Sequence, residues 1–175
     1  PSLDSGPYRA IEMSAGHVTL RSEVCPHSNL QVEREIRLVD GFSFTVQHRI
    51  INRGPHVRDV GIWSVMMLNH RTRIAVPGHN LKTYVVFGDT EGFWAASDQG
   101  LICDCHEQGE FKVGLRNPDS SVLLSLGDED EITWMRCESS RPKVEDTFAH
   151  GYPLEVFNSG DYAYCEAEWH GTLQT

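Results

Sequence analysis

Alternation of apolar and polar residues recurs from end to end of this chain, and it constrains the fold more than any other feature. A period of two places successive side chains on opposite faces of a β-strand, whereas an amphipathic helix needs apolar residues three and four positions apart. No stretch of ten or more residues shows that helical spacing. The pattern therefore predicts an all-β fold, an antiparallel β-sandwich that forms a single domain over residues 1–175.

One hairpin is predicted by a local turn signal. The segment Gln31–Leu38 leads into Asp40-Gly41, a dipeptide typical of two-residue type I′ turns, and then into a strand over Phe42–Asn52. Alternation gives this second strand one apolar face, made of Phe42, Phe44, Val46, His48 and Ile50. That face is expected to lie against the core.

Further strands are predicted between turn-forming clusters. Val60–Leu68 is almost continuously apolar, which is typical of a central strand covered on both faces. Shorter strands are expected at Arg73–Val76, Leu101–His106, Phe111–Leu115, Val122–Leu126 and Ile132–Cys137, and a last hairpin pairs Leu154–Phe157 with Tyr162–Trp169. The acidic run Asp128–Glu131 is interpreted as a solvated turn.

Charge and composition exclude several classes of partner. A formal net charge of -10 argues against nucleic acid, whose binding needs a clustered basic surface. No apolar run approaches the roughly 20 residues that span a bilayer, so no membrane segment is expected. The start of the chain lacks the features of a signal peptide, and an odd number of cysteines at irregular spacing favours a reducing compartment. These features together predict a cytoplasmic protein.

The last predicted strand carries the most informative side chains. Alternation places Tyr162, Tyr164, Glu166 and Glu168 on one face, and small or apolar residues on the other. Aromatic rings can cover the apolar C–H face of a sugar, while carboxylates accept hydrogen bonds from its hydroxyls. The alternative interpretation is a solvated edge strand with ordinary surface charge.

Two other segments contain residue types that occur in metal-binding or catalytic sites. Cys103-Asp104-Cys105-His106 contains zinc-ligand residue types, but alternation separates the thiols from His106 and no second ligand pair follows at the usual spacing. No metal is therefore expected. His48 lies on an apolar strand face, where a structural histidine is the alternative to a catalytic one. Neither a nucleophile elbow nor a glycine-rich phosphate loop occurs, so no cofactor is expected.

Five segments, taken in order, resemble a known family. They are residues 46–54 (VQHRIINRG), 62–67 (IWSVMM), 111–114 (FKVG), 151–157 (GYPLEVF) and 164–171 (YCEAEWHG). Their order and spacing resemble the later part of an uncharacterised bacterial branch of the galactose-mutarotase-like (aldose 1-epimerase-like) supersandwich proteins. The resemblance implies a large antiparallel supersandwich that binds carbohydrate on one sheet face.

The resemblance also implies candidate residues for chemistry. The catalytic glutamate of the epimerases corresponds best to Glu168, whereas their strand histidine has no counterpart, because Trp63 lies near its expected position. The opening strands of the family, with an arginine that the epimerases use, have no counterpart here either. Mutarotation needs a base at the anomeric hydroxyl and an acid at the ring oxygen, and only the base has a clear candidate.

Three functions are therefore carried forward. The leading hypothesis is a carbohydrate-binding domain without epimerase activity, in which a small-molecule sugar is the partner and the binding residues are Lys112, Glu155, Glu166, Glu168 and Trp63, with Arg49 and His48 as additions. The second is an aldose 1-epimerase with Glu168 as base and His48 or His70 as acid. The third is a protein-interaction module. Sheet edges left uncovered by the missing strands predict a homo-oligomer, a dimer in its simplest form.

Overall fold

The computed structural model describes residue 3 and residues 6–105, 109–116, 121–127 and 132–174. These residues form strands and no helix, so the predicted all-β fold is confirmed and no helix crosses a membrane in the described part of the chain. The strands are β1 (Tyr8–Ser14), β2 (His17–Ser22), β3 (Leu30–Leu38), β4 (Phe44–Asn52), β5 (Trp63–Asn69), β6 (Thr72–Pro77), β7 (Thr83–Gly88), β8 (Trp94–Ser97), β9 (Gly100–Cys105), β10 (Phe111–Leu115), β11 (Ser121–Leu126), β12 (Thr133–Glu138), β13 (Leu154–Asn158) and β14 (Tyr164–His170).

The chain divides into two compact units. The N-terminal unit extends to Val60 and includes Gln174, whose backbone pairs with that of Val60, and the C-terminal unit is Gly61–Leu173. A compact unit of a structure need not fold as an independent domain. The expectation of one domain over residues 1–175 therefore stays a prediction.

The N-terminal unit is an antiparallel sheet in the order β1-β2-β3-β4. Cross-strand pairs such as Ile36 with Val46 and Val32 with Ile50 form its apolar face, which agrees with the predicted face of β4. The opposite face carries polar and charged pairs, among them Glu33 with Arg49 and Glu35 with Gln47. Alternation therefore predicted the two faces of β3 and β4 but not the strands β1 and β2. The expectation that the apolar face of β4 lies against the core is wrong, because Phe44 and Val46 are 56% and 41% exposed.

The turn between β3 and β4 differs from the prediction. A type I′ turn needs positive φ at both central residues, and Gly41 is not among the residues with positive φ. Instead the backbone N–H of Val39 donates to the carbonyl of Ser43 at 2.9 Å, and the Asp40 carboxylate accepts from the N–H of Phe42 at 2.8 Å. Phe42 thus lies in the loop and is fully exposed.

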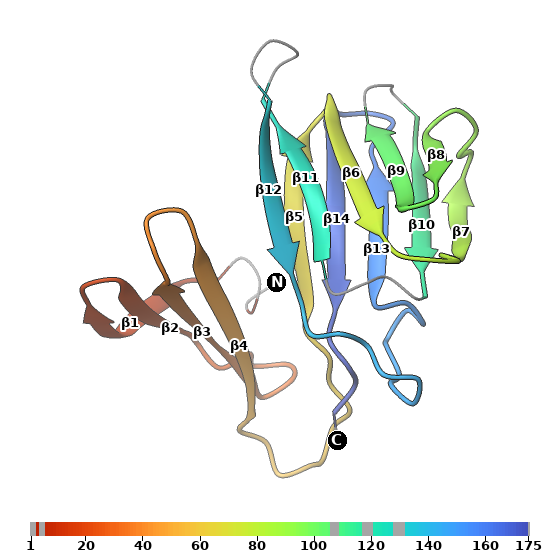
Figure 1. Cartoon of the computed structure of the whole chain (residues 1–175). Coiled ribbons are helices and arrows are strands. Elements are labelled where there is room, and N and C mark those ends of the chain that lie inside the picture. Colours follow the sequence, from red (N-terminus) through yellow and green to blue (C-terminus); the bar gives the residue numbers. More distant parts are fainter. Residues whose placement is uncertain (1–2, 4–5, 106–108, 117–120, 128–131, 175) are drawn as a thin grey trace. The chain divides into compact units, whose positions relative to one another are not determined.

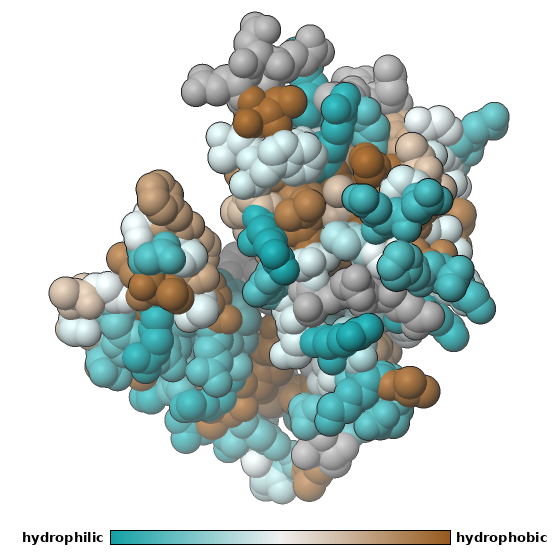
Figure 2. Space-filling view, in the orientation of Figure 1, coloured by the Kyte–Doolittle hydropathy of each residue, from teal (hydrophilic) through white to brown (hydrophobic). Residues whose placement is uncertain are grey.

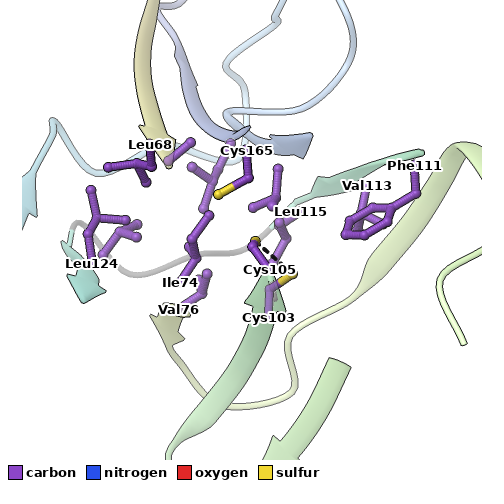
Figure 3. Close-up of a cluster of buried hydrophobic side chains, with 14 residues drawn as sticks. Leu68, Ile74, Val76, Cys103, Cys105, Phe111, Val113, Leu115, Leu124 and Cys165 are labelled. Atoms are coloured by element: carbon purple, nitrogen blue, oxygen red, sulfur yellow. Dashed lines mark hydrogen bonds between the residues drawn. The ribbon is translucent and has the colours of Figure 1, made fainter. Parts of the chain in front are cut away.

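The C-terminal unit is the sandwich (Figure 1). One sheet has the order β5-β14-β13-β10-β7 and the other β12-β11-β6-β9-β8, with antiparallel neighbours throughout. Buried side chains from both sheets meet between the two layers, and Figure 3 shows Leu68, Leu115 and Cys165 of the first sheet with Ile74, Leu124 and Cys105 of the second. One face of the β5-β14-β13-β10-β7 sheet therefore packs in this core, and its other face can carry polar side chains.

The prediction that Val60–Leu68 forms a central strand is wrong. The strand begins at Trp63 and lies at the edge of its sheet, where it pairs only with β14. Its apolar character has two sources, because Met66 and Leu68 face the core whereas Trp63, Val65 and Met67 are 56%, 42% and 63% exposed. A continuous apolar run therefore reflected an exposed apolar face, not burial on both sides.

Candidate functional site

The face of the β5-β14-β13-β10-β7 sheet that points away from the core, here called the outer face, gathers most of the predicted site residues. Register places Glu155 opposite Glu168, Phe157 opposite Lys112, and Trp63 opposite His170. Alternation then puts on this one face Trp63, Met67, Lys112, Glu155, Phe157, Tyr164, Glu166, Glu168 and His170. β14 is an inner strand, so the alternative of a solvated edge strand is wrong.

A lysine ammonium bridges two carboxylates at the centre of the outer face. The Nζ of Lys112 lies 2.9 and 3.0 Å from the two carboxylate oxygens of Glu168, and 3.4 Å from Oε2 of Glu155. Burial lowers the pKa of Lys112, but the pairing with both carboxylates outweighs it and raises that pKa above its ordinary value. The ammonium is therefore charged at neutral pH.

Glu168, which the sequence predicted as a sugar-binding residue, is not accessible to solvent. Its side chain is 0% exposed, and Glu155 is 1% exposed. Residues from two other strands contact Glu168. Trp63 Nε1 of the adjacent strand β5 donates to Oε2 at 2.8 Å, and Lys112 approaches from β10, on the far side of β13. Glu166, two residues earlier, is half-buried, and its pKa is raised by burial and then by the negative charge of Glu168.

Trp63 presents an oriented aromatic ring to solvent. Its indole N–H is held by Glu168, and its ring stacks on that of His170 with the planes 7° apart and the centroids 6.2 Å apart. The Lys112 ammonium lies 5.7 Å from the same ring and 5.8 Å from the ring of Phe157. More than half of the Trp63 side chain nevertheless remains exposed. The surface of the cluster is thus aromatic, with one cation beside it.

Two histidines that sequence reasoning missed join Glu155. His150 Nδ1 and His170 Nε2 each lie 3.2 Å from Oε2 of Glu155. Burial lowers the pKa of His170, although the charge of Glu155 acts in the opposite direction. His170 could have been found from alternation, because it follows Glu168 by two residues on β14. His150 lies in the loop before β13, where no periodic signal places it.

A glycine shapes the β10 side of the site. Gly114 lies opposite Glu155, and the ring of Tyr152 lies so close to it that an added Cβ would come within 2.3 Å of a ring atom. The ring of Tyr152 in turn packs against the ring of Tyr84, with the two centroids 5.5 Å apart. Glycine is therefore required here for close approach of a side chain, not for an unusual backbone conformation.

The structure does not join the remaining predicted residues to this cluster. Arg49 and His48 belong to the N-terminal unit, on opposite faces of β4. Arg49 donates to Glu33 at 3.1 Å, and burial followed by the charge of Arg34 lowers the pKa of His48. A hollow of about 300 Å³ lies on the charged face of this sheet. Its Arg and Glu side chains pair with one another, which is typical of a solvated charged surface.

His70, the other candidate acid, lies far from Glu168 along the sheet. Asn69 pairs with Tyr164, whereas Glu168 pairs with Val65 at the other end of β5. His70 lies five positions after Val65, just beyond the end of β5, a distance on the order of 16 Å at about 3.3 Å per residue. One sugar ring cannot bridge that distance between a base and an acid.

Three of the five cysteines, Cys103, Cys105 and Cys165, belong to the core. None of the five forms a disulfide, and the Sγ atoms of Cys103 and Cys105 lie 3.7 Å apart, as the dashed line in Figure 3 marks. The pKa of Cys105 is raised by its hydrogen bond with Cys103 and by burial, and that of Cys165 by its hydrogen bond with Cys105 and by burial. Cys103, Cys105 and Cys165 lie within the cluster of buried hydrophobic side chains, so they act as core residues. His106 and Asp128–Glu131 lie outside the described residues. The cytoplasmic location stays a prediction.

A comparison of the chain with models of protein families, with curated proteins and with solved structures found no match. The resemblance to the galactose-mutarotase-like proteins consequently stays a proposal, and the function is argued from the outer face itself.

Proposed function

We propose that the outer face binds carbohydrate and does not catalyse epimerisation. The observation that carries this proposal is Trp63, an aromatic ring that is 56% exposed yet fixed by a hydrogen bond to Glu168 and by stacking on His170. A ring held in place before the ligand arrives loses little conformational entropy on binding. Such a ring provides the flat apolar surface that a pyranose C–H face needs.

Polar groups beside Trp63 supply the hydrogen bonds that a sugar requires. Lys112 keeps 15% of its side chain exposed, and its ammonium can donate to a hydroxyl while it remains paired with Glu168. Glu166 is half-buried on the same face and can accept hydrogen bonds when ionised. Glu168 and Glu155 then act as positioning residues that hold the Trp63 indole and the Lys112 ammonium, and do not contact the sugar.

The burial of Glu168 argues against the epimerase alternative. A general base must come within hydrogen-bond reach of the anomeric hydroxyl, and it must be free to take up the proton. Glu168 has no exposed surface and is held by both Lys112 and Trp63. Binding without epimerisation is therefore the activity that this arrangement supports best.

The test compares two exposed tryptophans on opposite sheets. Isothermal titration of a panel of hexoses, pentoses and short oligosaccharides should identify a ligand, and Trp63→Ala should weaken its binding tenfold or more. Trp134, which is 52% exposed on β12 of the other sheet, provides the matched control, and Trp134→Ala should bind as the parent does. Polarimetry with each bound aldose should show no faster mutarotation. Equal affinity of the two variants, or no binding by any sugar, would overturn the proposal.

A second proposal concerns the assembly of the chain. Hydrophobic side chains gather at the end of the β3–β4 hairpin (Figure 2), which motivates it. Leu38, Val39, Phe42 and Phe44 are 63%, 64%, 104% and 56% exposed. Exposed apolar clusters of this kind mark contact surfaces, and a second copy of the chain would cover both equivalent clusters symmetrically. Light scattering at tens of micromolar should then give a dimer mass, and Phe42→Ser/Phe44→Ser should give a monomer. A monomeric parent would contradict this proposal and leave the sugar proposal unaffected.

A further inference from the structure

His150, Glu155 and His170 bring three metal-ligating groups together, and among the residues that the structure describes no other group of three or more does so. We propose that these side chains bind a divalent transition metal ion, with Zn²⁺ as the ion that fits best. Two imidazoles and one carboxylate form a donor set that Zn²⁺ prefers, and three protein ligands leave a fourth position for water or a ligand. The proposal does not depend on sugar binding.

The distances among the donors suit a single ion. Zn²⁺ lies about 2.0 to 2.2 Å from N and O ligands in tetrahedral sites, so neighbouring donors are about 3.3 Å apart. His150 Nδ1 and His170 Nε2 each lie 3.2 Å from Glu155 Oε2, and all three donor atoms lie within 4.8 Å of one another. Only the distance between the two histidine nitrogens has to shorten for all three donors to reach one ion. His150, whose side chain is 52% exposed, is free to make that adjustment.

Two buried polar atoms in this cluster lack the partners that burial normally requires. Oε1 of Glu155, a side chain that is 1% exposed, accepts no hydrogen bond within the described residues. Nε2 of His170 is also buried and, despite its proximity to Glu155, makes no hydrogen bond of acceptable geometry. Buried polar atoms are almost always satisfied in native proteins. A metal ion would satisfy the nitrogen and one or both carboxylate oxygens.

The charge of the cluster also leaves a place for a cation. Glu155 and Glu168 are both buried, but they share one ammonium, that of Lys112. Lys112 is the competing cation for Glu155, yet it lies closer to Glu168, at 2.9 Å, than to Glu155, at 3.4 Å. A buried carboxylate is costly unless a charge compensates it. A divalent ion at Glu155 would allow Lys112 to remain with Glu168.

The residues around the donors would hold two of them in position. Trp63 stacks on the His170 ring, which orients the imidazole on β14, and the backbone of β13 fixes Glu155 opposite Glu168. His150 comes from the loop between β12 and β13. The ion would therefore fasten this loop to the sheet beside Trp63 and leave its open position near the outer surface.

The test is titration of the full chain, first stripped with a chelator, with ZnCl₂ followed by isothermal calorimetry. We expect about one equivalent to bind and the melting temperature to rise with zinc, as it does for any ligand of the folded state. His150→Ala should weaken binding about tenfold or more, because one of three ligands is lost. His79→Ala, which removes an exposed histidine of the β6–β7 loop in the same unit, should bind as the parent does.

Cobalt(II) gives an independent readout, because its visible absorption is intense only in four- or five-coordinate sites. The parent and His79→Ala should develop this absorption at one equivalent, and His150→Ala should not. His150 is exposed, so its removal should leave the circular dichroism spectrum unchanged. Absence of zinc binding by the parent, or equal affinity of His150→Ala and the parent, would overturn the proposal. Neither result would bear on the affinity for sugar.

Discussion

Replacement of Glu168 by glutamine should destabilise the C-terminal unit, because it removes one charge from a buried network. Loss of one partner of a buried ion pair costs about 3 to 5 kcal/mol when the other charge is left uncompensated. Two contacts reduce that cost here. Lys112 keeps Glu155 at 3.4 Å, and the amide oxygen of the glutamine can still accept from Trp63. We therefore expect a loss of about 2 to 3 kcal/mol in the free energy of unfolding.

Urea unfolding followed by tryptophan fluorescence measures this loss, since all four tryptophans belong to the C-terminal unit. The melting temperature should fall by about 4 to 12 °C, at about 2 to 4 °C per kcal/mol for a chain of this size. The matched control is Glu138→Gln, which removes an exposed ion pair with Arg136 and should cost less than about 1 kcal/mol. A Glu168→Gln variant as stable as the Glu138→Gln control would refute the buried network.

Three further predictions follow from single contacts. Gly114→Ala should lower the free energy of unfolding by about 1 to 3 kcal/mol in the same urea assay, because the new methyl group meets the Tyr152 ring. An unchanged midpoint of urea unfolding would mean that the ring does not pack there. The folded-state pKa of Glu166 is raised, so this group stabilises the fold below its unfolded pKa of about 4.5 and that contribution is lost as the pH rises. Glu166→Gln should thus be more stable than the parent at pH 7, with the difference shrinking toward pH 4, and a constant difference would contradict the sign. Of the five thiols only Cys137 is partly exposed, so Ellman's reagent should label at most one thiol in the native protein, and two or more would contradict the buried thiol cluster.

Strand positions were largely predictable from alternation. The period of two placed β3, β4 and most of the strands from β9 onward within one or two residues, because each has one core face and one polar face. The strands β1, β2, β7 and β8 were missed, and their burial explains why. Met13 of β1 and Val85, Val86 and Phe87 of β7 are all more than two fifths exposed, so apolar residues occur on both faces and the alternation is weak.

The sequence predicted part of the outer-face cluster, but it predicted neither the two histidines nor the burial of the carboxylates. Alternation on β14 and the hairpin with β13 correctly placed Glu155 and Glu168 together, and Lys112, one of the predicted binding residues, lies beside them. Burial of the two carboxylates depends on what covers them, which is Trp63 from an edge strand and His150 from a loop. Those contacts join residues about 105 positions apart in the chain or lie outside any periodic element, and no local pattern encodes them.

The most direct test of the proposed function is to observe the Trp63 indole during a sugar titration. The chain has four tryptophans, so a ¹⁵N–¹H correlation spectrum should contain four indole signals, which single substitutions to phenylalanine assign. If the outer face binds carbohydrate, a sugar from the panel should shift the Trp63 signal saturably and leave that of Trp134 unchanged. A Trp63 signal that stays in place with every sugar, or a sugar that shifts Trp134 instead, would contradict carbohydrate binding at the outer face.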